Sequence, residues 1–349
     1  MVRKSALTVL SLGLLAAASP AAVPNVGSGT LQLAPRVPTP GLIDDLLGGI
    51  TTEIGLLIKD ILNGLKSAQS DELSSKPLTC LLGLDPCCKW YDVSAALTDL
   101  FKGANGQCTD LARGAVRFGF HDAGAWSESS PNGGADGSLM MDFGEENRPE
   151  NNGLQTIRTT LRSVQAKFGV GYADLAQFAH NHATVTCPRG PRIRTFVGRK
   201  DATKAAPEGL LPDVHSPADT LIKLFEDKSF TPHDLAALVG AHTSAKQRFV
   251  DTAQANKPMD TTPGVWDVEF YNETLHPPAN GEIFVLPSDQ VLSKHPRVED
   301  EWKEFVGDQR HWNEDYAKAW VRMSLLGVGK SELGGLKECT RALPAAVPV

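Results

Sequence analysis

Two histidines of this sequence lie where residue type and spacing could do chemistry. His121 follows Arg117 by four residues, so a helix would bring an imidazole base and a guanidinium cation onto one face. His242 ends an apolar run, and the small residues Gly240 and Ala241 before it leave space for a flat ligand that the imidazole could bind. Taken alone, each histidine would be interpreted as a hydrogen-bonded core residue, and Arg117 as a surface charge.

Helical periodicity predicts the element that carries the second histidine. Thr231 can cap a helix that has Pro232 at its first position and Asp234 completing a capping box. His242 then falls seven residues after Leu235, on the stripe that this helix would bury.

A second helix is expected over residues 109–121, where Leu111, Ala115 and Phe118 form one apolar stripe. Strand alternation is scarce and no internal repeat is present, so we expect a mainly α fold with long irregular connections. Further helices are expected over residues 153–168, 172–182 and 302–326.

The first 77 residues differ in composition from the rest of the chain. Residues 1–22 combine Arg3 and Lys4 with an apolar run and small residues, which is typical of a secretory signal peptide and too short to span a bilayer comfortably. Residues 23–77 contain no Cys, His or aromatic residue and are interpreted as a pro-segment or low-complexity arm. Within them, residues 42–65 have the apolar spacing of a loosely held amphipathic helix.

Size, charge and cysteine usage narrow the class of protein. With 349 residues and 41% apolar content, the chain can enclose a cofactor in one large domain or two moderate ones. Loss of residues 1–22 would take the formal net charge from −7 to −9, which argues against a nucleic-acid partner. Six cysteines in an exported chain suit three disulfides, with fifteen possible pairings, and the lack of a CxxC pair argues against a zinc site. Asn272-Glu273-Thr274 could carry a glycan.

The two histidine motifs together resemble the distal and proximal motifs of the plant, fungal and bacterial haem peroxidase superfamily. They read Arg117-Phe118-Gly119-Phe120-His121-Asp122-Ala123 and Leu238-Val239-Gly240-Ala241-His242-Thr243. Four more segments resemble the secreted fungal class that contains lignin and manganese peroxidases: residues 134–138, 151–154, 258–267 and 286–289. The likeness runs in collinear order from about Cys80 to Cys339. It implies a two-lobed, mainly α peroxidase domain over residues 78–341 with little β structure, one haem b between distal and proximal helices, and a short tail over residues 342–349.

On the distal side, the resemblance implies acid–base chemistry on hydrogen peroxide. His121 would take a proton from the peroxide and return it to the leaving oxygen, while Arg117 would stabilise the charge that builds there. Asn151 would accept a hydrogen bond from the other nitrogen of His121, with Glu145 as its associated carboxylate. Phe120 would pack over the haem face and help exclude water.

On the proximal side, His242 would bind the haem iron and donate its other N–H to Asp289. The resemblance also implies two calcium ions, and oxygen donors in short loops suit that ion, although alone they would be interpreted as ordinary acidic loops. The expected ligands of the first ion are Asp122, Gly134, Asp136 and Ser138. Those of the second are Thr243, Asp260, Thr262, Val265 and Asp267.

The resemblance further implies a disulfide pattern. A fourth bridge usual in the fungal enzymes is not expected, because Asp300 stands where they have a cysteine. The three expected bridges are Cys80–Cys88, Cys87–Cys339 and Cys108–Cys187.

The specialised electron-donor sites of the class have diverged here. The three manganese-binding carboxylates correspond to Asp110, Gly114 and Arg248, and the surface tryptophan of lignin peroxidases corresponds to Ala237. We therefore expect oxidation of phenols and other small aromatic donors at the haem edge, with hydrogen peroxide as oxidant. Other tryptophans could relay electrons from the surface, but burial is the interpretation we favour for each: Trp126, Trp302 and Trp312.

Two rival functions are weighed against this one. An inactive, secreted calcium-binding interaction protein on a peroxidase scaffold is disfavoured by the complete set of haem-site residues. A non-haem metal hydrolase would need His180 and His182, which diverge on a helix and lack a completing carboxylate. We expect an extracellular monomer with no membrane partner.

Overall fold

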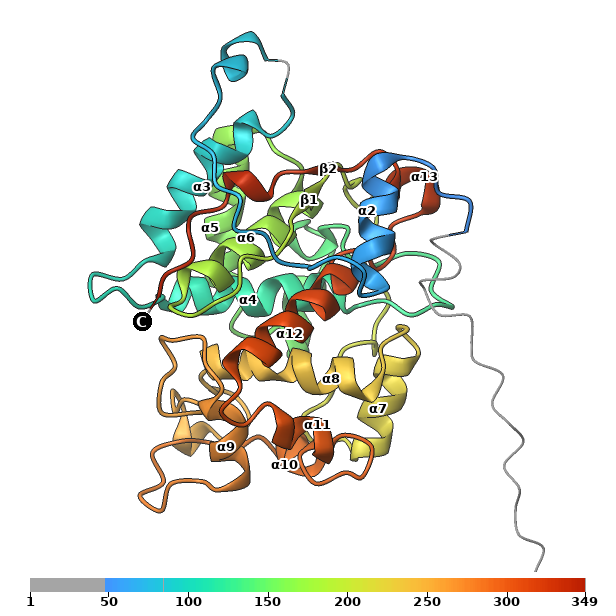
Figure 1. Cartoon of the computed structure of the whole chain (residues 1–349). Helices are drawn as coiled ribbons and strands as arrows, with labels where there is room; N and C mark the ends of the chain where they lie inside the picture. The colour runs from blue at the N-terminus through green and yellow to red at the C-terminus, as the bar shows by residue number, and fades with distance from the viewer. Residues whose placement is uncertain (1–47, 84, 349) are drawn as a thin grey trace, which may run out of the picture. The chain divides into compact units, whose positions relative to one another are not determined.

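The computed structural model describes residues 48–83 and 85–348 (Figure 1). The expected signal peptide over residues 1–22 and the first part of the expected arm, residues 23–47, lie outside the described residues. The described chain is mainly helical with little β structure, which confirms the expected fold class. Its α-helices are α2 (Glu53–Leu62), α3 (Cys88–Phe101), α4 (Asp110–Ala123), α5 (Gln155–Phe168), α6 (Tyr172–Thr186), α7 (Ala218–Glu226), α8 (Pro232–Val239), α9 (Glu269–Leu275), α10 (Pro287–Leu292), α11 (Glu299–Glu304), α12 (Gln309–Met323) and α13 (Lys330–Leu333).

Short elements connect these helices. The sheet of the described residues pairs β1 (Phe196–Val197) antiparallel with β2 (Lys337–Glu338). The 3-10 helices are Leu78–Leu82, Ser138–Met140, Glu145–Asn147, Pro149–Asn151, Gly240–Ser244, Thr252–Gln254 and Thr340–Ala342.

Within residues 48–348, Figure 1 shows two groups of helices. The first contains α3 to α6, with α4 packed along α6, and the second contains α7 to α11. The long helix α12 crosses the molecule and contacts α8 of the second group. The 3-10 helix that follows α8 approaches α4 of the first group. The expected distal and proximal helices therefore belong to different groups and face one another.

Local sequence signals set the start of both helices. The Thr109 side chain accepts a hydrogen bond from Ala112 N at the start of α4. At α8, Thr231 and Asp234 form the expected capping box, with Pro232 in the first turn.

The end of α8 differs from the expectation of one continuous helix. The α-helix stops at Val239, and His242 lies on the 3-10 helix that follows it. Two aromatic side chains cause the change, because Tyr271 Oη donates to Ala236 O at 2.8 Å and Trp312 Nε1 donates to Ala237 O at 2.9 Å. These donors take carbonyls that a continuing helix would use itself.

A single helix over residues 302–326 was the wrong expectation. The chain forms α11 and α12 instead, separated at Gly307, whose φ of +78° lies in the left-handed region. Asp308 then caps α12 by accepting a hydrogen bond from His311 N at 3.0 Å.

The described part of the arm is integrated into the core. Ile58 and Ile61 of α2 are fully buried and pack with the main apolar cluster, and α2 contacts α12. Beyond this helix, Arg194 N donates to Ala68 O at 2.8 Å and Ser70 N donates to Arg192 O at 3.0 Å. This segment is therefore held more firmly than the loose helix that we expected.

The disulfides close one short loop and two long ones. All three expected bridges are present: Cys80–Cys88, Cys87–Cys339 and Cys108–Cys187. The second joins residues 252 positions apart and so ties the start of α3 to the C-terminal segment.

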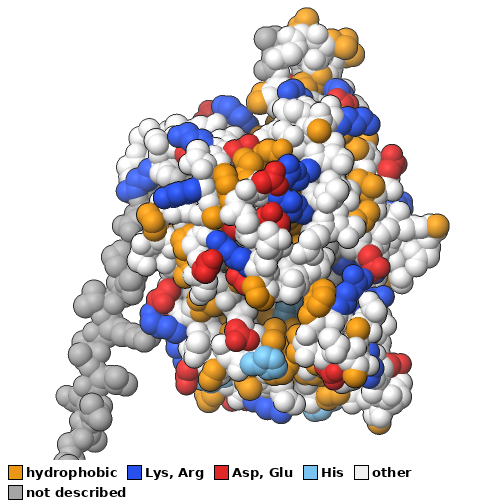
Figure 2. All heavy atoms as spheres, turned by 180° about the vertical axis from the view of Figure 1, so that it is seen from behind, with side chains coloured by type: hydrophobic (Ala, Val, Ile, Leu, Met, Phe, Trp, Pro, Cys, Tyr) orange, Lys and Arg blue, Asp and Glu red, His pale blue; other side chains and the backbone are white. Residues whose placement is uncertain are grey.

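Charged side chains of both signs lie on the face that Figure 2 shows, and the three tryptophans considered as electron relays lie inside the protein. On the face shown in Figure 2, basic and acidic side chains are intermingled. Trp126, Trp302 and Trp312 are all buried, as we favoured. Among the described residues, no helix combines the length and the apolar character needed to cross a bilayer.

Candidate active site

A large cavity lies between α4 and the segment that follows α8. Its volume is about 1130 Å³, slightly above the range of about 300–1,000 Å³ that is common for small-molecule sites. His121 and His242 both line it, together with apolar side chains from α7, α8 and α10. The cavity can therefore hold a large flat group between two imidazoles.

The distal histidine is held by an amide. Nδ1 of His121 lies 2.8 Å from Oδ1 of Asn151, an oxygen that only accepts, so Nδ1 carries the proton. Nε2 accepts a hydrogen bond from Arg117 Nε at 3.1 Å. The same guanidinium donates to the carbonyl oxygens of Asn152 at 2.8 Å and Glu150 at 2.7 Å, which fixes its position at the cavity wall.

Electrostatics keep this imidazole a free base. Burial lowers the pKa of His121 well below its usual value, and the charge of Arg117 lowers that pKa further. Desolvation by the surrounding protein also lowers the pKa of Arg117, to about 10, although the residue is exposed at the cavity, so the guanidinium remains a cation at neutral pH. A neutral base and a cation thus lie side by side at the cavity.

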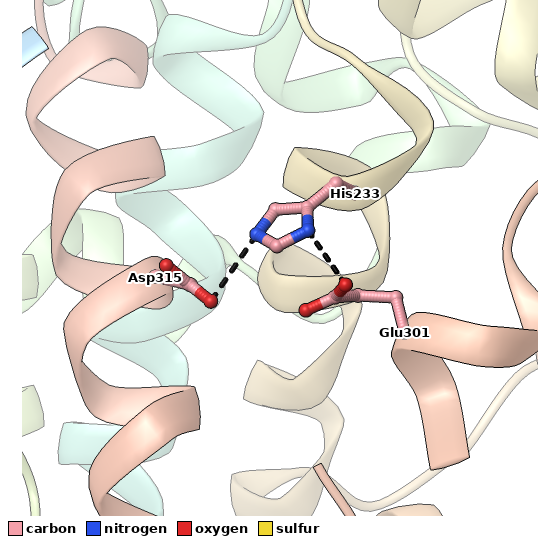
Figure 3. A group of neighbouring side chains, drawn as sticks. All are labelled: His233, Glu301 and Asp315. Atoms are coloured by element: carbon pink, nitrogen blue, oxygen red, sulfur yellow. Dashed lines mark ion pairs between the residues drawn. The ribbon is translucent and has the colours of Figure 1, made fainter. Parts of the chain in front are cut away.

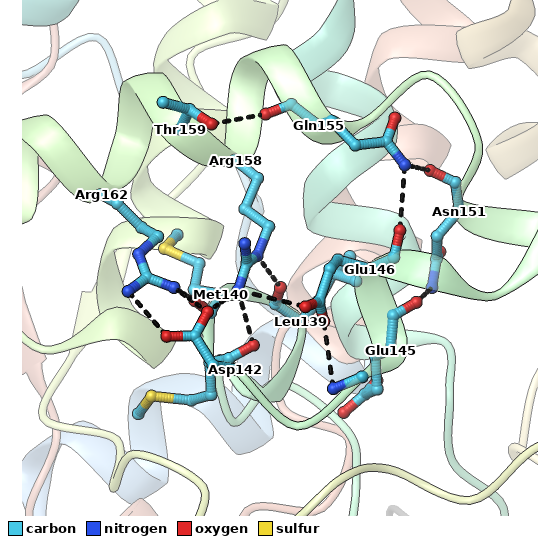
Figure 4. A network of polar contacts seen from close by, with 12 residues as sticks. Leu139, Met140, Asp142, Glu145, Glu146, Asn151, Gln155, Arg158, Thr159 and Arg162 are labelled. Carbon is cyan, nitrogen blue, oxygen red and sulfur yellow. Dashed lines mark hydrogen bonds and ion pairs between the residues drawn. The ribbon is translucent and has the colours of Figure 1, made fainter.

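A polar network supports Asn151, as Figure 4 shows. Its amide donates to Glu145 O at 2.8 Å, and Gln155 Nε2 donates to Glu146 O at 2.9 Å. The link from Asn151 to Glu145 therefore runs through a backbone carbonyl. The Glu145 carboxylate itself accepts from Ala206 N at 2.7 Å.

Arginines of α5 extend this network. Arg158 Nε donates to Leu139 O at 3.0 Å, and both Arg158 and Arg162 pair with Asp142 (Figure 4). The loop over residues 139–142 is thereby attached to α5, which packs on α4.

The proximal histidine has a buried carboxylate partner. Nδ1 of His242 lies 3.0 Å from Oδ2 of Asp289, at the start of α10. Asp289 is only 1% exposed, and its other oxygen accepts from Ser288 Oγ at 3.3 Å. The carboxylate takes Nδ1, so Nε2 is the nitrogen available to a metal in the cavity.

Phe120 lines the same cavity, next to His121, and its ring stacks on Phe225 of α7 with centroids 6.2 Å apart. The sequence analysis did not single out Phe225. The apolar spacing of Leu221, Ile222 and Phe225 predicts a buried face of α7, but not which ring it covers.

The expected distal calcium ligands lie close together, at the C-terminal end of α4 and in the loop over residues 134–138. Asp122 Oδ2 accepts from Gly137 N at 3.1 Å, Asp136 Oδ1 accepts from Ser138 N at 3.0 Å, and Gly134 O accepts from Asp136 N at 2.8 Å. Burial raises the pKa of both carboxyl groups, and their mutual repulsion raises that of Asp122 further. The buried Ser138 hydroxyl has no partner among the described residues. These donors fit a hard cation.

The expected proximal calcium ligands also gather. Thr262 Oγ1 donates to Asp267 Oδ1 at 3.1 Å, and Val265 N closes the loop on Thr262 O at 2.8 Å. Burial, reinforced by the charge of Asp267, raises the pKa of Asp260 to about 8. Oδ2 of Asp260 and Oγ1 of Thr243 are buried without a partner among the described residues. Two carboxylates and an orphaned hydroxyl again fit a calcium ion.

The two histidines of the rival hydrolase are structural. His180 Nδ1 lies 2.9 Å from Val116 O, and His182 Nε2 lies 2.9 Å from Ser94 O. Burial lowers the pKa of His180 to about 3 and that of His182 to about 4. Each ring therefore serves its own packing contacts, and the two do not form one metal site.

Comparison with known proteins decides the family. The family model described as Peroxidase matches residues 92–308, which is more than half of the chain. This chain belongs to the peroxidase family. The matched region includes both histidines and every expected haem-site and calcium residue.

Individual relatives place this peroxidase near fungal enzymes. A peroxidase of Arthromyces ramosus is 30% identical over 285 residues, which cover 75% of this chain and 77% of the relative. The relative named ligninase LG2 of Phanerodontia chrysosporium is 30% identical over 313 residues, covering 82% and 83% of the two chains. The family implies that the cofactor is haem.

The positions that the sequence analysis matched to the donor sites of the fungal class contain no complete carboxylate set. Asp110 forms ion pairs with Arg113 and Arg248, at 3.9 Å in the second case. Gly114 packs on Ile157 and offers no ligand, and Ala237 is fully buried.

Proposed function

We propose that this peroxidase is a secreted, monomeric haem enzyme that reduces hydrogen peroxide and oxidises phenols and other small aromatic donors. The peroxidase domain would span residues 78–341, after a signal peptide (1–22) and an arm (23–77), and before a tail (342–349). The observation that carries the proposal is one cavity lined by two partnered histidines, His121 with Asn151 and His242 with Asp289.

The distal residues would move one proton. His121 Nε2 takes it from hydrogen peroxide and returns it to the departing oxygen, so that water leaves instead of hydroxide. Arg117 stabilises the negative charge on that oxygen. Asn151 keeps the base in the correct tautomer by accepting from Nδ1. When bound, haem b supplies two electrons to the peroxide and recovers them singly from donors.

The proximal residues would hold the cofactor. His242 binds the iron through Nε2, and Asp289 makes the imidazole more electron-rich by accepting from Nδ1. Phe120 covers the distal face of the cavity and limits water there.

The proposed donors are small aromatics that reach the open cavity edge. Arg248 beside Asp110 repels a manganese ion, and Ala237 provides no surface ring. Steady-state assays with a phenol, a non-phenolic aromatic and manganese(II) test this proposal. We expect fast oxidation of the phenol alone. Fast, saturable oxidation of manganese(II) would contradict the proposal that small aromatics are the donors.

An absorption spectrum of the purified protein tests the cofactor. An intense Soret band, lost in His242→Ala and retained in His276→Ala, is expected. A parent protein without the band would instead favour the inactive scaffold.

We also propose that both carboxylate clusters bind calcium. Removing the ions with a chelator should lower the thermal midpoint, because buried carboxylates then repel one another. Asp122 and Thr243 each follow a cavity histidine, so the Soret band should decay faster as well. Added calcium should restore both properties, and a midpoint insensitive to chelator and calcium would contradict the assignment.

A further inference from the structure

A buried tyrosine and a buried histidine share a hydrogen bond at the cavity wall. Tyr316 of α12 and His180 of α6 both line the cavity, and both side chains are almost fully buried. Tyr316 Oη lies 3.0 Å from His180 Nε2. Since the ring centroids are 6.3 Å apart, the two rings meet through this bond and not face to face. Packing explains the other nitrogen of His180, but not this contact.

The direction of the hydrogen bond follows from that other nitrogen. Nδ1 of His180 lies 2.9 Å from Val116 O, an oxygen that only accepts, so Nδ1 carries the proton. Nε2 therefore has a free lone pair, and Tyr316 donates to it. Burial lowers the pKa of His180 to about 3 and raises that of Tyr316 well above its usual value. At neutral pH the pair is thus a protonated phenol that faces a neutral base.

This arrangement favours the loss of an electron from the tyrosine. Removing an electron makes a phenol a strong acid, and a positive charge on a buried ring is costly. The hydrogen bond lets the proton move to His180 as the electron leaves, so the oxidised ring stays neutral. Because His180 binds a proton weakly, it returns the proton when the electron is restored.

The neighbouring rings lack a base of this kind. Trp320 stacks on His180 with ring centroids 3.2 Å apart. Trp266 meets the Tyr316 ring with centroids 4.7 Å apart. Nε1 of each tryptophan is buried and has no hydrogen-bond partner among the described residues. Tyr271 donates its hydroxyl to a backbone carbonyl, which cannot hold a proton. An electron hole in this group of rings is therefore most stable on Tyr316.

A histidine beside the ring of Phe305 has the opposite charge state. His233 Nε2 lies 3.1 Å from Asp315 Oδ2, and its Nδ1 lies 2.7 Å from Glu301 Oε2 (Figure 3). The hydrogen bond to Asp315, with the charge of Glu301, raises the pKa of His233 to about 9. This ring is a cation at neutral pH and cannot accept a proton, whereas His180 can.

We propose that Tyr316 and His180 form a redox-active pair that supplies one electron to the oxidised cofactor. The inference rests on the haem chemistry of the proposed function. After peroxide has taken two electrons, Tyr316 returns one of them to the cofactor, and its phenolic proton moves from Oη to His180 Nε2. The products are a neutral tyrosyl radical and an imidazolium. One electron from an aromatic donor, with the proton that His180 holds, later restores Tyr316.

Electron paramagnetic resonance of the holoprotein, frozen soon after mixing with hydrogen peroxide in the absence of a donor, tests the pair. We expect a tyrosyl radical whose signal narrows when the protein contains ring-deuterated tyrosine. Tyr316→Phe should abolish this signal. The matched control is Tyr91→Phe, which should retain it, because the Tyr91 hydroxyl lies 2.6 Å from Ser74 Oγ and not from an imidazole.

His180→Gln tests the proton transfer separately. A glutamine oxygen can accept the same hydrogen bond but cannot hold the proton, so the radical should form at least about tenfold more slowly. In the parent, radical formation should also slow in heavy water, because a proton moves with the electron. A purely structural role of His180 would not produce this isotope effect. Since the heavy-water measurement uses the unmodified chain, it decides the case even if a variant fails to fold.

The outcomes distinguish this inference from the proposed function. A parent that reacts with peroxide but forms no tyrosyl radical, or a radical that persists in Tyr316→Phe, would contradict the inference alone. Equal rates in the parent and His180→Gln, or in light and heavy water, would show that His180 does not take the proton. A parent that does not react with peroxide would contradict both the inference and the proposed function.

Discussion

Each cavity histidine has its Nδ1 beside a protein oxygen, which leaves Nε2 of His242 without a described protein partner at this site and Nε2 of His121 accepting from Arg117. Desolvation and the charge of Arg117 lower the pKa of His121 and favour its neutral form, and the uncharged amide oxygen of Asn151 bonds its Nδ1. In the proposed function, the carboxylate of Asp289 would make His242 a stronger metal ligand. Spacing alone does not predict either partner, because Asn151 lies 30 residues from His121 and Asp289 lies 47 from His242. The family resemblance supplied both.

Buried neutral histidines predict acid sensitivity. The pKa of His182 is about 4 in the folded chain and about 6.5 when unfolded. Between these values the unfolded chain binds a proton that the folded chain does not, so stability is lost as pH falls below about 6.5. His180 behaves in the same way, with a folded pKa of about 3. Each of the two histidines should change the free energy of unfolding by up to about 1.4 kcal/mol per pH unit.

The measurement is the free energy of unfolding between about pH 7 and pH 4. The slope of this free energy against pH gives the number of protons taken up on unfolding. His182→Gln should reduce that number by up to about one, while His276→Gln, at an exposed position, should leave it unchanged. A slope unchanged in His182→Gln would mean that this ring takes up its proton in the folded state.

At the scale of elements, helix starts were predictable and helix ends were less so. The Thr231 capping box lies within four residues, and it marks the first turn of α8 correctly. The 3-10 segment after Val239 depends on Tyr271 and Trp312, which come from α9 and α12. The break at Gly307 was missed because apolar periodicity continues on both sides of it.

Gly240 begins the 3-10 helix that carries His242 and has no room for a side chain. A Cβ at residue 240 would lie 2.5 Å from Trp312 Nε1 and would also overlap Tyr271 Oη. Gly240→Ala should therefore lose about 1–3 kcal/mol of stability and release haem faster, since His242 is two residues away. Thermal unfolding and transfer of haem to an acceptor protein measure the two effects.

Gly329→Ala is the matched control for this prediction. A Cβ there meets nothing within 4 Å, and the backbone φ is −75°, which alanine adopts freely. If both alanine variants retained haem equally well, the tight contact at Gly240 would have no role in holding the proximal segment.

At the scale of the whole molecule, covalent bonds connect the ends of the domain to its core. Cys87–Cys339 closes the longest loop, and α2 packs against α12 within the same apolar cluster. Composition alone suggested a loose arm, because residues 23–77 lack aromatic residues. The burial of Ile58 and Ile61 depends on partners far along the chain, so no local signal could reveal it.

The Cys87–Cys339 and Cys80–Cys88 bridges should differ in their effect on stability. Replacing both Cys87 and Cys339 with serine should lower the free energy of unfolding by about 2–5 kcal/mol, since this bridge constrains a long loop. The matched double variant of Cys80 and Cys88 opens a loop closed over 8 positions, beside the exposed Leu81, and should lose less. Denaturant unfolding of both variants checks the order, and the reverse order would contradict it.

The central claim is that His121 and His242 face one haem from opposite sides. Rapid mixing with hydrogen peroxide, followed at the Soret band, tests it in the holoprotein and in His121→Ala. The account predicts that the variant retains the band through His242 but reacts at least about 100-fold more slowly, because the proton transfer has lost its base. A variant that reacts with peroxide as fast as the parent would contradict the account.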